Sequence, residues 1–300
     1  MENISNEKII FRDFLEANNS KKFEGGLRFK KNFKSSKLNY PVVTIITVVK
    51  NNEKYIEETI KSVLNQKYKN IEYIIVDGNS SDGTVEIIKK YENSIDYIIS
   101  ENDLGLYDAF NKGISISKGD LIGMVNSDDI LLPDATEILV KYYNKYPNID
   151  FFFGTVKKHW GLLHGFKPWK IKFTWYFYTS HSTGFYIKKE VAKEIGKYSL
   201  KYKYVSDFDY FYRLIVHKKK LGMATKKNEI FGIFRPGGLS SIIDFWDLFF
   251  EKNQIRIDNK QNKYLILITV LFKIILHFKR IRSFKIKNFV IFFQNNFIKS

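Results

Sequence analysis

Strand-like segments that alternate with helix-like segments constrain the fold of this chain most strongly. Residues 42–49 (VVTIITVV) are all β-branched and mostly apolar, as expected of a strand buried on both faces. The following segment, 55–65, places Ile56 and Ile60 at helical spacing. Three more strands, each followed by a helix-like segment, are expected at 71–76, 95–100 and 121–125. This alternation predicts an α/β fold with a mainly parallel sheet.

Polar clusters follow three of these predicted strands, at the point where each strand ends. They are residues 50–53, residues 77–82 and the pair Asp128–Asp129. Ligands of open α/β sheets bind beyond the carboxyl ends of the strands, so clusters at one edge predict a ligand site. Asp77 is placed to accept a hydrogen bond from a nucleotide base, and the Asp128–Asp129 pair to hold a divalent cation that shares phosphate ligands. For any single cluster, the ordinary alternative is a polar loop or turn.

Several site types are excluded or disfavoured by missing residues. No Gly-x-Gly-x-x-Gly motif follows the first strand and no Gly-Lys-Ser/Thr loop is present, which disfavours a dinucleotide-binding Rossmann domain and a P-loop nucleotidase. The chain has no cysteine, which excludes disulfides, thiolate metal sites and a cysteine nucleophile.

The order of the motifs resembles that of the family-two, inverting GT-A glycosyltransferases. Residues 44–84 (TIITVVKNNEKYIEETIKSVLNQKYKNIEYIIVDGNSSDGT) are similar to the opening of their Rossmann-like nucleotide-sugar domain. Residues 101–129 (ENDLGLYDAFNKGISISKGDLIGMVNSDD) are similar to its second half and match the bacterial surface-polysaccharide branch best. The segments SHSTGFYIKKEV, VSDFDYFYRL and FRPGGLSS extend the resemblance over roughly residues 41–241.

The resemblance implies roles for individual residues. Asp129 would bind a divalent metal, Mn²⁺ or Mg²⁺, and Asp207 would act as the catalytic base. One departure is Phe110, which precedes Asn111 where many relatives carry an arginine. The residues implied to bind the nucleotide sugar are Thr47, Val49, Glu53, Asp77, Ser80, Asp108, Lys112, Asn126, Ser127 and Asp128.

Some of these roles have structural alternatives. Asp207 could instead cap a helix that is expected to run to about Val216. His181, Arg235 and Gly238 are candidates for contacts with the acceptor or the diphosphate. The alternative for His181 is an ordinary polar side chain, and for residues 236–240 an ordinary turn.

The leading hypothesis is a metal-dependent inverting glycosyltransferase of the hexosyltransferase type. It would move a sugar from a nucleotide-sugar donor, with uridine as the preferred base, to a glycan or lipid-linked acceptor in surface polysaccharide biosynthesis. A sugar-nucleotide binder without turnover is one alternative. A nucleic-acid-binding protein is another, motivated by the net charge of +17. The absence of RNP, KH and zinc motifs disfavours it, and no nucleic-acid partner is expected.

Composition and motifs divide the chain into three predicted segments. Residues 1–40 form a basic N-terminal extension, residues 41–241 the GT-A domain, and residues 242–300 a helical, basic, amphipathic segment. From residue 251 onward, eleven Lys and Arg residues face two acidic ones. The apolar run 264–278 is shorter than the roughly twenty residues of a membrane-spanning helix.

Basic side chains beside apolar ones suit an interfacial helix on an anionic membrane surface. The alternative is a helical hairpin that packs on the catalytic domain. No unbroken apolar stretch is present in the first twenty residues, so a cleaved secretory signal is not expected. We therefore expect a cytoplasmic protein that is peripheral at the inner face of the plasma membrane.

Overall fold

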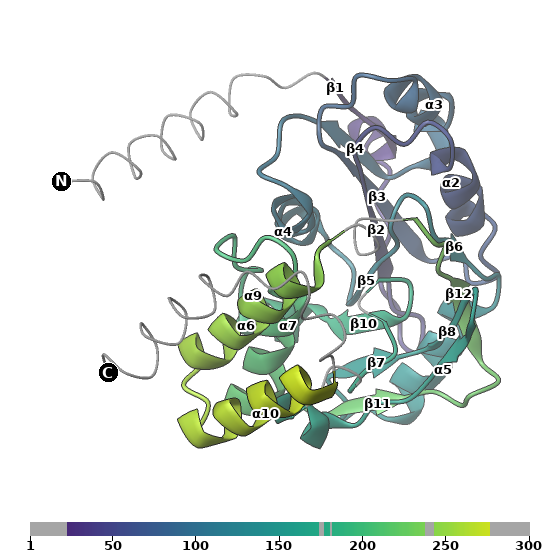
Figure 1. Ribbon diagram of the computed structural model, residues 1–300. Helices are drawn as coiled ribbons and strands as arrows, with labels where there is room; N and C mark the ends of the chain where they lie inside the picture. The colour runs from purple at the N-terminus through teal and green to yellow at the C-terminus, as the bar shows by residue number, and fades with distance from the viewer. Residues whose placement is uncertain (1–22, 174–176, 181, 238–242, 277–300) are drawn as a thin grey trace. The chain divides into compact units, whose positions relative to one another are not determined.

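The computed structural model describes residues 23–173, 177–180, 182–237 and 243–276 (Figure 1). The chain forms two compact units that interleave along the sequence. The first unit contains the residues up to 166 together with 179–198 and 220–236, and the second contains 167–178, 199–219 and the residues from 237 onward. The segmentation expected at residues 40 and 241 stays a prediction.

The first unit is built on an eight-stranded sheet with the order β1-β4-β3-β2-β5-β10-β7-β11. Strands β2, β3, β4 and β5 run parallel to their neighbours within this group, which confirms the predicted mainly parallel α/β fold. The strands are β1 (Phe23–Gly25), β2 (Val43–Val49), β3 (Ile71–Asp77), β4 (Tyr97–Ser100), β5 (Leu121–Met124), β7 (Phe151–Phe153), β10 (Phe185–Lys188) and β11 (Gly222–Ala224). The four strands expected from the sequence are thus present within two residues of their predicted ends.

Helices cover both faces of this sheet because β2 is apolar on both sides. Val43 and Ile45 belong to a core that also contains residues of α2, α3 and α5. Ile46 points to the other face, where a Cβ added to Gly113 of α4 would lie only 2.5 Å from its Cγ2. Figure 1 shows α4 on one side of the central strands and α2 and α3 on the other. The helices of this unit are η1 (Leu27–Lys30), α2 (Ile56–Leu64), α3 (Thr84–Lys90), η2 (Glu92–Ser94), α4 (Leu106–Ile116), α5 (Ala135–Lys145) and α6 (Lys189–Ile195).

A smaller sheet of four strands completes the first unit, with the order β6-β12-β8-β9. Its strands are β6 (Ile130–Leu131), β8 (Thr155–Lys158), β9 (Gly161–Leu163) and β12 (Ile230–Ile233). Strands β8 and β12 are parallel, so their carboxyl ends lie at the same edge. Strand β6 follows Asp128–Asp129 directly, which joins this sheet to the candidate site.

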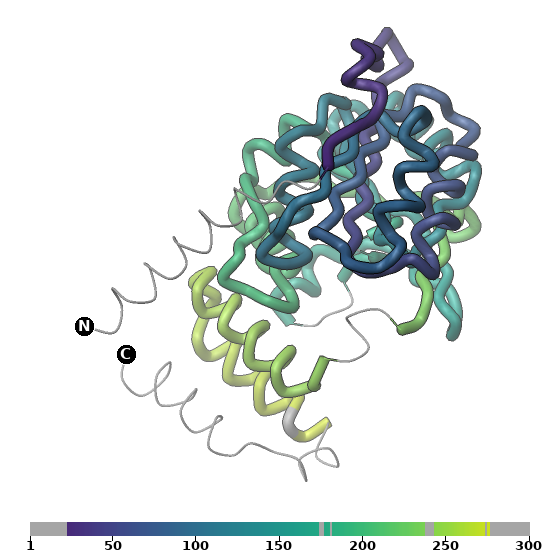
Figure 2. Tube along the Cα trace, turned by 90° about the horizontal axis from the view of Figure 1, so that it is seen from above, coloured from purple at the N-terminus to yellow at the C-terminus, as the bar shows by residue number. Residues whose placement is uncertain are grey.

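The second unit is helical in its described part. It consists of η3 (Pro168–Lys172), α7 (Ser206–Tyr212), the π-helical turn η4 (Arg213–His217), α9 (Phe245–Asp258) and α10 (Lys263–Leu276). Helices α9 and α10 lie side by side (Figure 2) and pack through Trp246, Phe249, Ile266 and Val270. The predicted helical character of the C-terminal region is thereby confirmed for these residues. Within the described residues, no helix is long and apolar enough to cross a membrane.

Candidate active site

Hydrogen bonds join the polar loops that follow β2, β3 and β5. The backbone N–H of Asn51 donates to Ser80 Oγ at 2.8 Å. The side-chain amide of Asn52 donates to Ser127 Oγ, also at 2.8 Å. The three polar clusters that the sequence places at one edge of the sheet therefore lie together in the structure.

Asp77 ends β3 in the middle of this edge and is fully buried. Its Oδ2 accepts hydrogen bonds from the Ser80 backbone N–H at 3.0 Å and from Ser100 Oγ at 2.6 Å, and its Oδ1 accepts one from the Ser80 hydroxyl. Thr47 is buried as well and accepts a hydrogen bond from the Tyr73 hydroxyl at 3.1 Å. Internal hydrogen bonds therefore fix the side chains of Asp77, Ser80 and Thr47 in place.

Val49 and Glu53 hold the loop after β3 against the end of β2. The buried Val49 accepts a hydrogen bond at its carbonyl from the Gly78 N–H at 2.8 Å. Glu53 Oε2 accepts one from the Gly83 N–H at 2.7 Å. Both residues thus shape the predicted nucleotide pocket through its backbone.

Asp129 is a buried carboxylate at the end of the loop that joins β5 to β6. Its Oδ2 accepts hydrogen bonds from Thr183 Oγ1 at 2.8 Å and from Ser182 Oγ at 3.1 Å. Burial and the neighbouring charge of Asp128 raise the pKa of Asp129 to about 7. Burial also raises the pKa of Asp128. Burial of this carboxylate pair therefore favours a bound proton or cation.

Buried acceptors at this edge have no hydrogen-bond partner among the described residues. They are Oδ1 of Asp129, Oδ1 of Asn126 and Oδ1 of Asn79. The amide nitrogens of the two asparagines are used, because Asn126 donates to Ser182 at 3.0 Å and Asn79 to Asn102 at 2.6 Å. Unpaired buried acceptors cost free energy, so three of them near one sheet edge favour a bound ligand that supplies donors or a cation.

The Asp128–Asp129 pair fits a hard divalent cation. Asp129 presents an unpaired carboxylate oxygen, which is the ligand type that Mg²⁺ and Mn²⁺ prefer. The part of the chain that the structure describes contains no group of three or more His, Cys, Asp or Glu side chains able to hold a metal. A cation at Asp129 would therefore take further ligands from substrate phosphates and water, as Mg²⁺ usually does.

Asp108 and Lys112 lie on α4 and hold the loop that follows β4. Lys112 Nζ donates to the carbonyl of Asn102 at 2.7 Å and pairs with Glu101 at 2.9 Å. Asp108 Oδ2 accepts a hydrogen bond from the Leu104 N–H at 3.0 Å. These contacts fix the position of residues 101–104 at the same edge as Asp77.

That loop contributes Asp103, which the sequence analysis did not single out. A Cβ added to Gly78 would lie 2.3 Å from Asp103 Oδ2, so the carboxylate lies directly against the residue after Asp77. Burial raises the pKa of Asp103, and the charges of Lys50 and Lys112 oppose this rise. The signal that could have found it is the cluster 101–103, which follows a predicted strand as the other three clusters do.

The position at which many relatives carry an arginine belongs to the core in this chain. Phe110 is fully buried, and its ring centroid lies 6.0 Å from that of Tyr198. The adjacent Asn111 exchanges two hydrogen bonds with the backbone of Tyr198, at 2.8 and 2.9 Å. This part of α4 therefore anchors the chain near residue 198.

Arg235 follows β12. Of the three candidates for contacts with the acceptor or the diphosphate, it is the one that lies within the described residues. It forms an ion pair with Glu58, and its guanidinium lies 4.7 Å from the centroid of the Tyr55 ring. His181 and Gly238 lie outside the described residues.

Asp207 belongs to the second unit, in the first turn of α7. Val205 holds the cap position of this helix. Asp207 Oδ2 accepts a hydrogen bond from the Tyr178 hydroxyl at 2.7 Å. The carboxylate of Glu251 accepts the backbone N–H groups of Tyr204 and Val205 at 2.8 and 2.9 Å, which fixes the start of the helix.

The two aspartates of α7 have different surroundings. Asp209 is held by Arg213 Nε and by Asn259 Nδ2, each at 2.9 Å, and is therefore a structural residue. The charge of Asp207 acts on the buried ammonium group of Lys252. Burial lowers the pKa of Lys252 to about 6, and the charge of Asp207 opposes this effect.

Comparison with known proteins identifies the family. The sequence model described as glycosyl transferase family 2 matches residues 44–208, more than half of the chain. The chain belongs to glycosyl transferase family 2. The membership predicted from the motifs is thus confirmed.

This family 2 glycosyltransferase has curated relatives in archaea and bacteria. It is 33% identical over 194 residues to an uncharacterized glycosyltransferase of Methanocaldococcus jannaschii, a match that covers 60% of this chain and 67% of the relative. It is 36% identical over 101 residues to the glycosyltransferase GlyG of Streptococcus pneumoniae, covering 33% and 34% of the two chains. In three of the bacterial relatives, GlyG among them, the match spans about a third of the relative's length.

Solved structures show the fold of the glycosyltransferase. It superposes on residues 1–349 of S. aureus TarS in complex with UDP-GlcNAc with a TM-score of 0.60 at 17% identity, covering 73% of this chain and 66% of that one. It is also similar to the mannosyltransferase PcManGT of Pyrobaculum calidifontis in complex with GDP-Man and Mn²⁺. That TM-score is 0.52 at 14% identity, with 77% and 67% coverage. These similarities confirm the GT-A fold.

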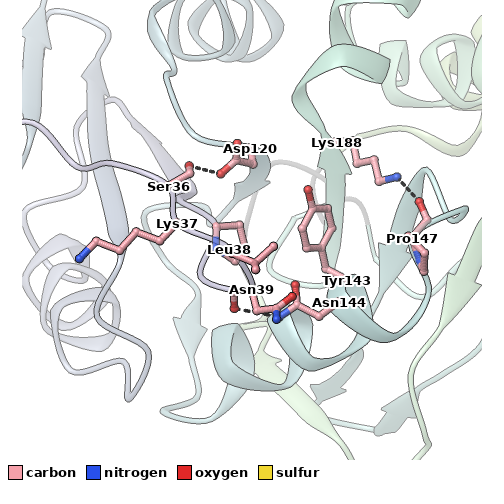
Figure 3. Close-up of a pocket in the computed structure, with 10 residues that line it drawn as sticks. Ser36, Lys37, Leu38, Asn39, Asp120, Tyr143, Asn144, Pro147 and Lys188 are labelled. Atoms are coloured by element: carbon pink, nitrogen blue, oxygen red, sulfur yellow. Dashed lines mark hydrogen bonds between the residues drawn. The ribbon is translucent and has the colours of Figure 1, made fainter.

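A pocket of about 330 Å³ lies at the edge of the eight-stranded sheet where β2 and β5 begin, opposite the carboxyl edge (Figure 3). It is lined by Pro41, which precedes β2, and Asp120, which precedes β5. Its polar groups bond to one another, since Lys188 Nζ donates to the Pro147 carbonyl at 2.6 Å and Asp120 accepts the hydroxyl of Ser36. The carboxyl edge, which carries the unpaired acceptors, is therefore the candidate site.

Proposed function

We propose that this glycosyltransferase transfers a sugar, with inversion, from a nucleotide-sugar donor to a glycan or lipid-linked acceptor. The observation that carries the proposal is Asp129, a buried carboxylate with one unpaired oxygen at the edge that also holds Asp77. We further propose that the donor is UDP-linked and that the product belongs to surface polysaccharide. The complex of TarS with UDP-GlcNAc supports the uridine donor, and the complex of PcManGT with GDP-Man makes guanosine the competing base.

The proposed chemistry follows from where charge develops. As the sugar leaves, negative charge grows on the nucleoside diphosphate, and a divalent cation bound at Asp129 would supply positive charge there. The acceptor hydroxyl is a weak nucleophile until a base removes its proton. Asp207 is our candidate for that base, and its hydrogen bond with Tyr178 orients the carboxylate.

The proposal is tested with the purified protein and a panel of nucleotide sugars, with and without Mn²⁺. We expect slow release of UDP from a UDP-sugar only when Mn²⁺ is present. We also expect UDP with Mn²⁺ to raise Tm, because a ligand that binds the folded state stabilises it. Binding without any turnover would favour the sugar-nucleotide binder. A rise in Tm with an oligonucleotide and none with any nucleotide would contradict the proposal.

We propose in addition that helix α10 docks the enzyme on an anionic membrane surface. Ile266 and Val270 pack on α9, whereas Ile268, Phe272 and Ile275 are 62%, 58% and 72% exposed. The exposed positions follow a spacing of four and three residues, so they share one face of the helix. The sequence from residue 277 onward adds six Lys or Arg residues and no acid. Apolar contact and positive charge together fit anionic lipid.

Replacing one apolar side chain of this face by an acid is expected to weaken membrane binding. The full chain should float with vesicles that contain anionic lipid at low salt, and Ile268→Glu should lose most of this binding. Leu221→Glu is the matched control, because Leu221 is 56% exposed in the first unit and receives the same charge change. Equal flotation of both variants, or none by the unaltered chain, would exclude α10 as the membrane contact.

A further inference from the structure

Lys158 is a half-buried cation at the end of β8. Its ammonium nitrogen lies 4.0 Å from the centroid of the Phe234 ring. In the described ranges no carboxylate lies within ion-pair distance of it, whereas Lys157 beside it on the strand is exposed. Burial lowers the pKa of Lys158, and Asp129 is the acid whose charge opposes this. Ile233 of β12 pairs with Lys157 on one side and with Ile130 on the other, so the register brings Lys158 and Asp129 to the two sides of Phe234.

Arg235, two residues after the end of β12, lies near the same carboxylate pair. Strands β8 and β12 are parallel, and the Phe234 N–H donates to the Lys157 carbonyl at 2.8 Å. The register pairs Lys157 with Ile233, so Lys158 lies opposite Phe234, and Arg235 is the next residue along the chain. Nη2 of Arg235 pairs with Glu58, but Nη1 is buried and without a partner in the described structure. The backbone N–H of Arg235 also lies near enough to Asp129 to lower the pKa of that carboxyl group.

The charges at this point are arranged for a ligand with several negative oxygens. A buried guanidinium N–H without an acceptor costs free energy, and the half-buried ammonium of Lys158 is partly desolvated. A divalent cation alone at Asp129 would be repelled by Lys158 and Arg235. A diphosphate would satisfy the divalent cation, the Lys158 ammonium and the Arg235 guanidinium together. Its oxygens can bind a cation and also accept hydrogen bonds from the two side chains.

We propose that Lys158, together with Arg235, binds the diphosphate of the donor and stabilises it as the leaving group. This inference rests on the proposed function. In the transfer, the bond between the anomeric carbon and the diphosphate oxygen breaks, and its electron pair stays on that oxygen. The bond from the acceptor oxygen to the anomeric carbon forms, and the acceptor proton passes to the base. Lys158 stabilises the charge on the departing oxygens, in addition to the charge that a divalent cation held by Asp129 would supply.

The test compares Lys158→Met with Lys157→Met, which removes the same charge from the exposed neighbour. Affinities for UDP and for uridine, or for GDP and guanosine if the unaltered protein binds GDP instead, are measured by titration calorimetry at a constant Mn²⁺ concentration. Because hydrogen bonds to charged groups are strong, we expect Lys158→Met to weaken UDP binding about ten- to a hundredfold and to leave uridine binding unchanged. Lys157→Met should change neither, and Lys158→Arg should restore most of the UDP affinity.

The possible outcomes separate this inference from the proposed function. If the unaltered protein binds neither UDP nor GDP, the proposed function itself is wrong, and the inference is lost with it. If the unaltered protein binds UDP and Lys158→Met binds it equally well, only the role of Lys158 is wrong. An equal loss of UDP and uridine affinity would also overturn the inference, because it would show a disturbed base pocket instead of a lost phosphate contact.

Discussion

Asp207→Asn is expected to lower the transfer rate about a hundred- to ten-thousandfold, the usual contribution of a positioned general base. The asparagine keeps the size of the side chain and an oxygen that can accept the hydrogen bond from the Tyr178 hydroxyl. It cannot take up the proton of the acceptor hydroxyl. Affinity for UDP should therefore stay close to that of the unaltered protein, while kcat falls.

A matched control comes from the same helix. Asp209→Asn changes the same functional group two residues away, but Asp209 binds Arg213 and Asn259 and is buried. We expect this variant to lower Tm, because it weakens a buried charge-assisted contact, and to retain transfer by the protein that stays folded. Transfer by Asp207→Asn within a few-fold of normal would leave Asp207 with a structural role only.

The central part of the fold could be predicted because its signals are local. An uninterrupted β-branched run such as 43–49 has few alternatives to a buried parallel strand, and the polar residues that follow it must then lie at the carboxyl edge. The same pattern predicts that Asp77 and Asp129 lie at one edge. The same signal is present for Asp103, which belongs to the polar cluster after the strand that ends at Ser100.

Other features could not be predicted because they depend on contacts that are distant in sequence. Lys157 and Lys158 form an ordinary basic pair in the sequence, and only the pairing of β8 with β12, more than seventy residues later, buries one of them. The second unit likewise combines residues 167–178 and 199–219 with the chain from residue 237 onward. Periodicity reports which side of an element is apolar, but it does not report which distant element covers that side.

Asp129→Asn is expected to abolish the Mn²⁺-dependent part of UDP binding and to leave the fold intact. The amide still accepts hydrogen bonds from Ser182 and Thr183, but it no longer carries the charge that a divalent cation requires. Calorimetric titration of UDP with and without Mn²⁺ measures this effect directly. Asp134→Asn is a suitable control, because Asp134 pairs with Lys67 on the surface and lies outside the candidate site. An unchanged Mn²⁺ dependence in Asp129→Asn would show that the metal ligand is another residue.

The raised pKa of Asp129 adds a pH dependence of known sign. Because this carboxyl group has a pKa of about 7 in the folded protein, protons compete with the cation below that pH. Mn²⁺-supported UDP binding should therefore strengthen as the pH rises from 6 to 8. The folded protein also binds this proton more tightly than the unfolded chain, whose carboxyl group has the ordinary value of 3.8. The metal-free protein should thus lose stability as the pH rises from about 4 to about 7. In Asp129→Asn this part of the loss should be missing, and a Tm profile that falls as steeply as that of the unaltered protein would assign it to other groups.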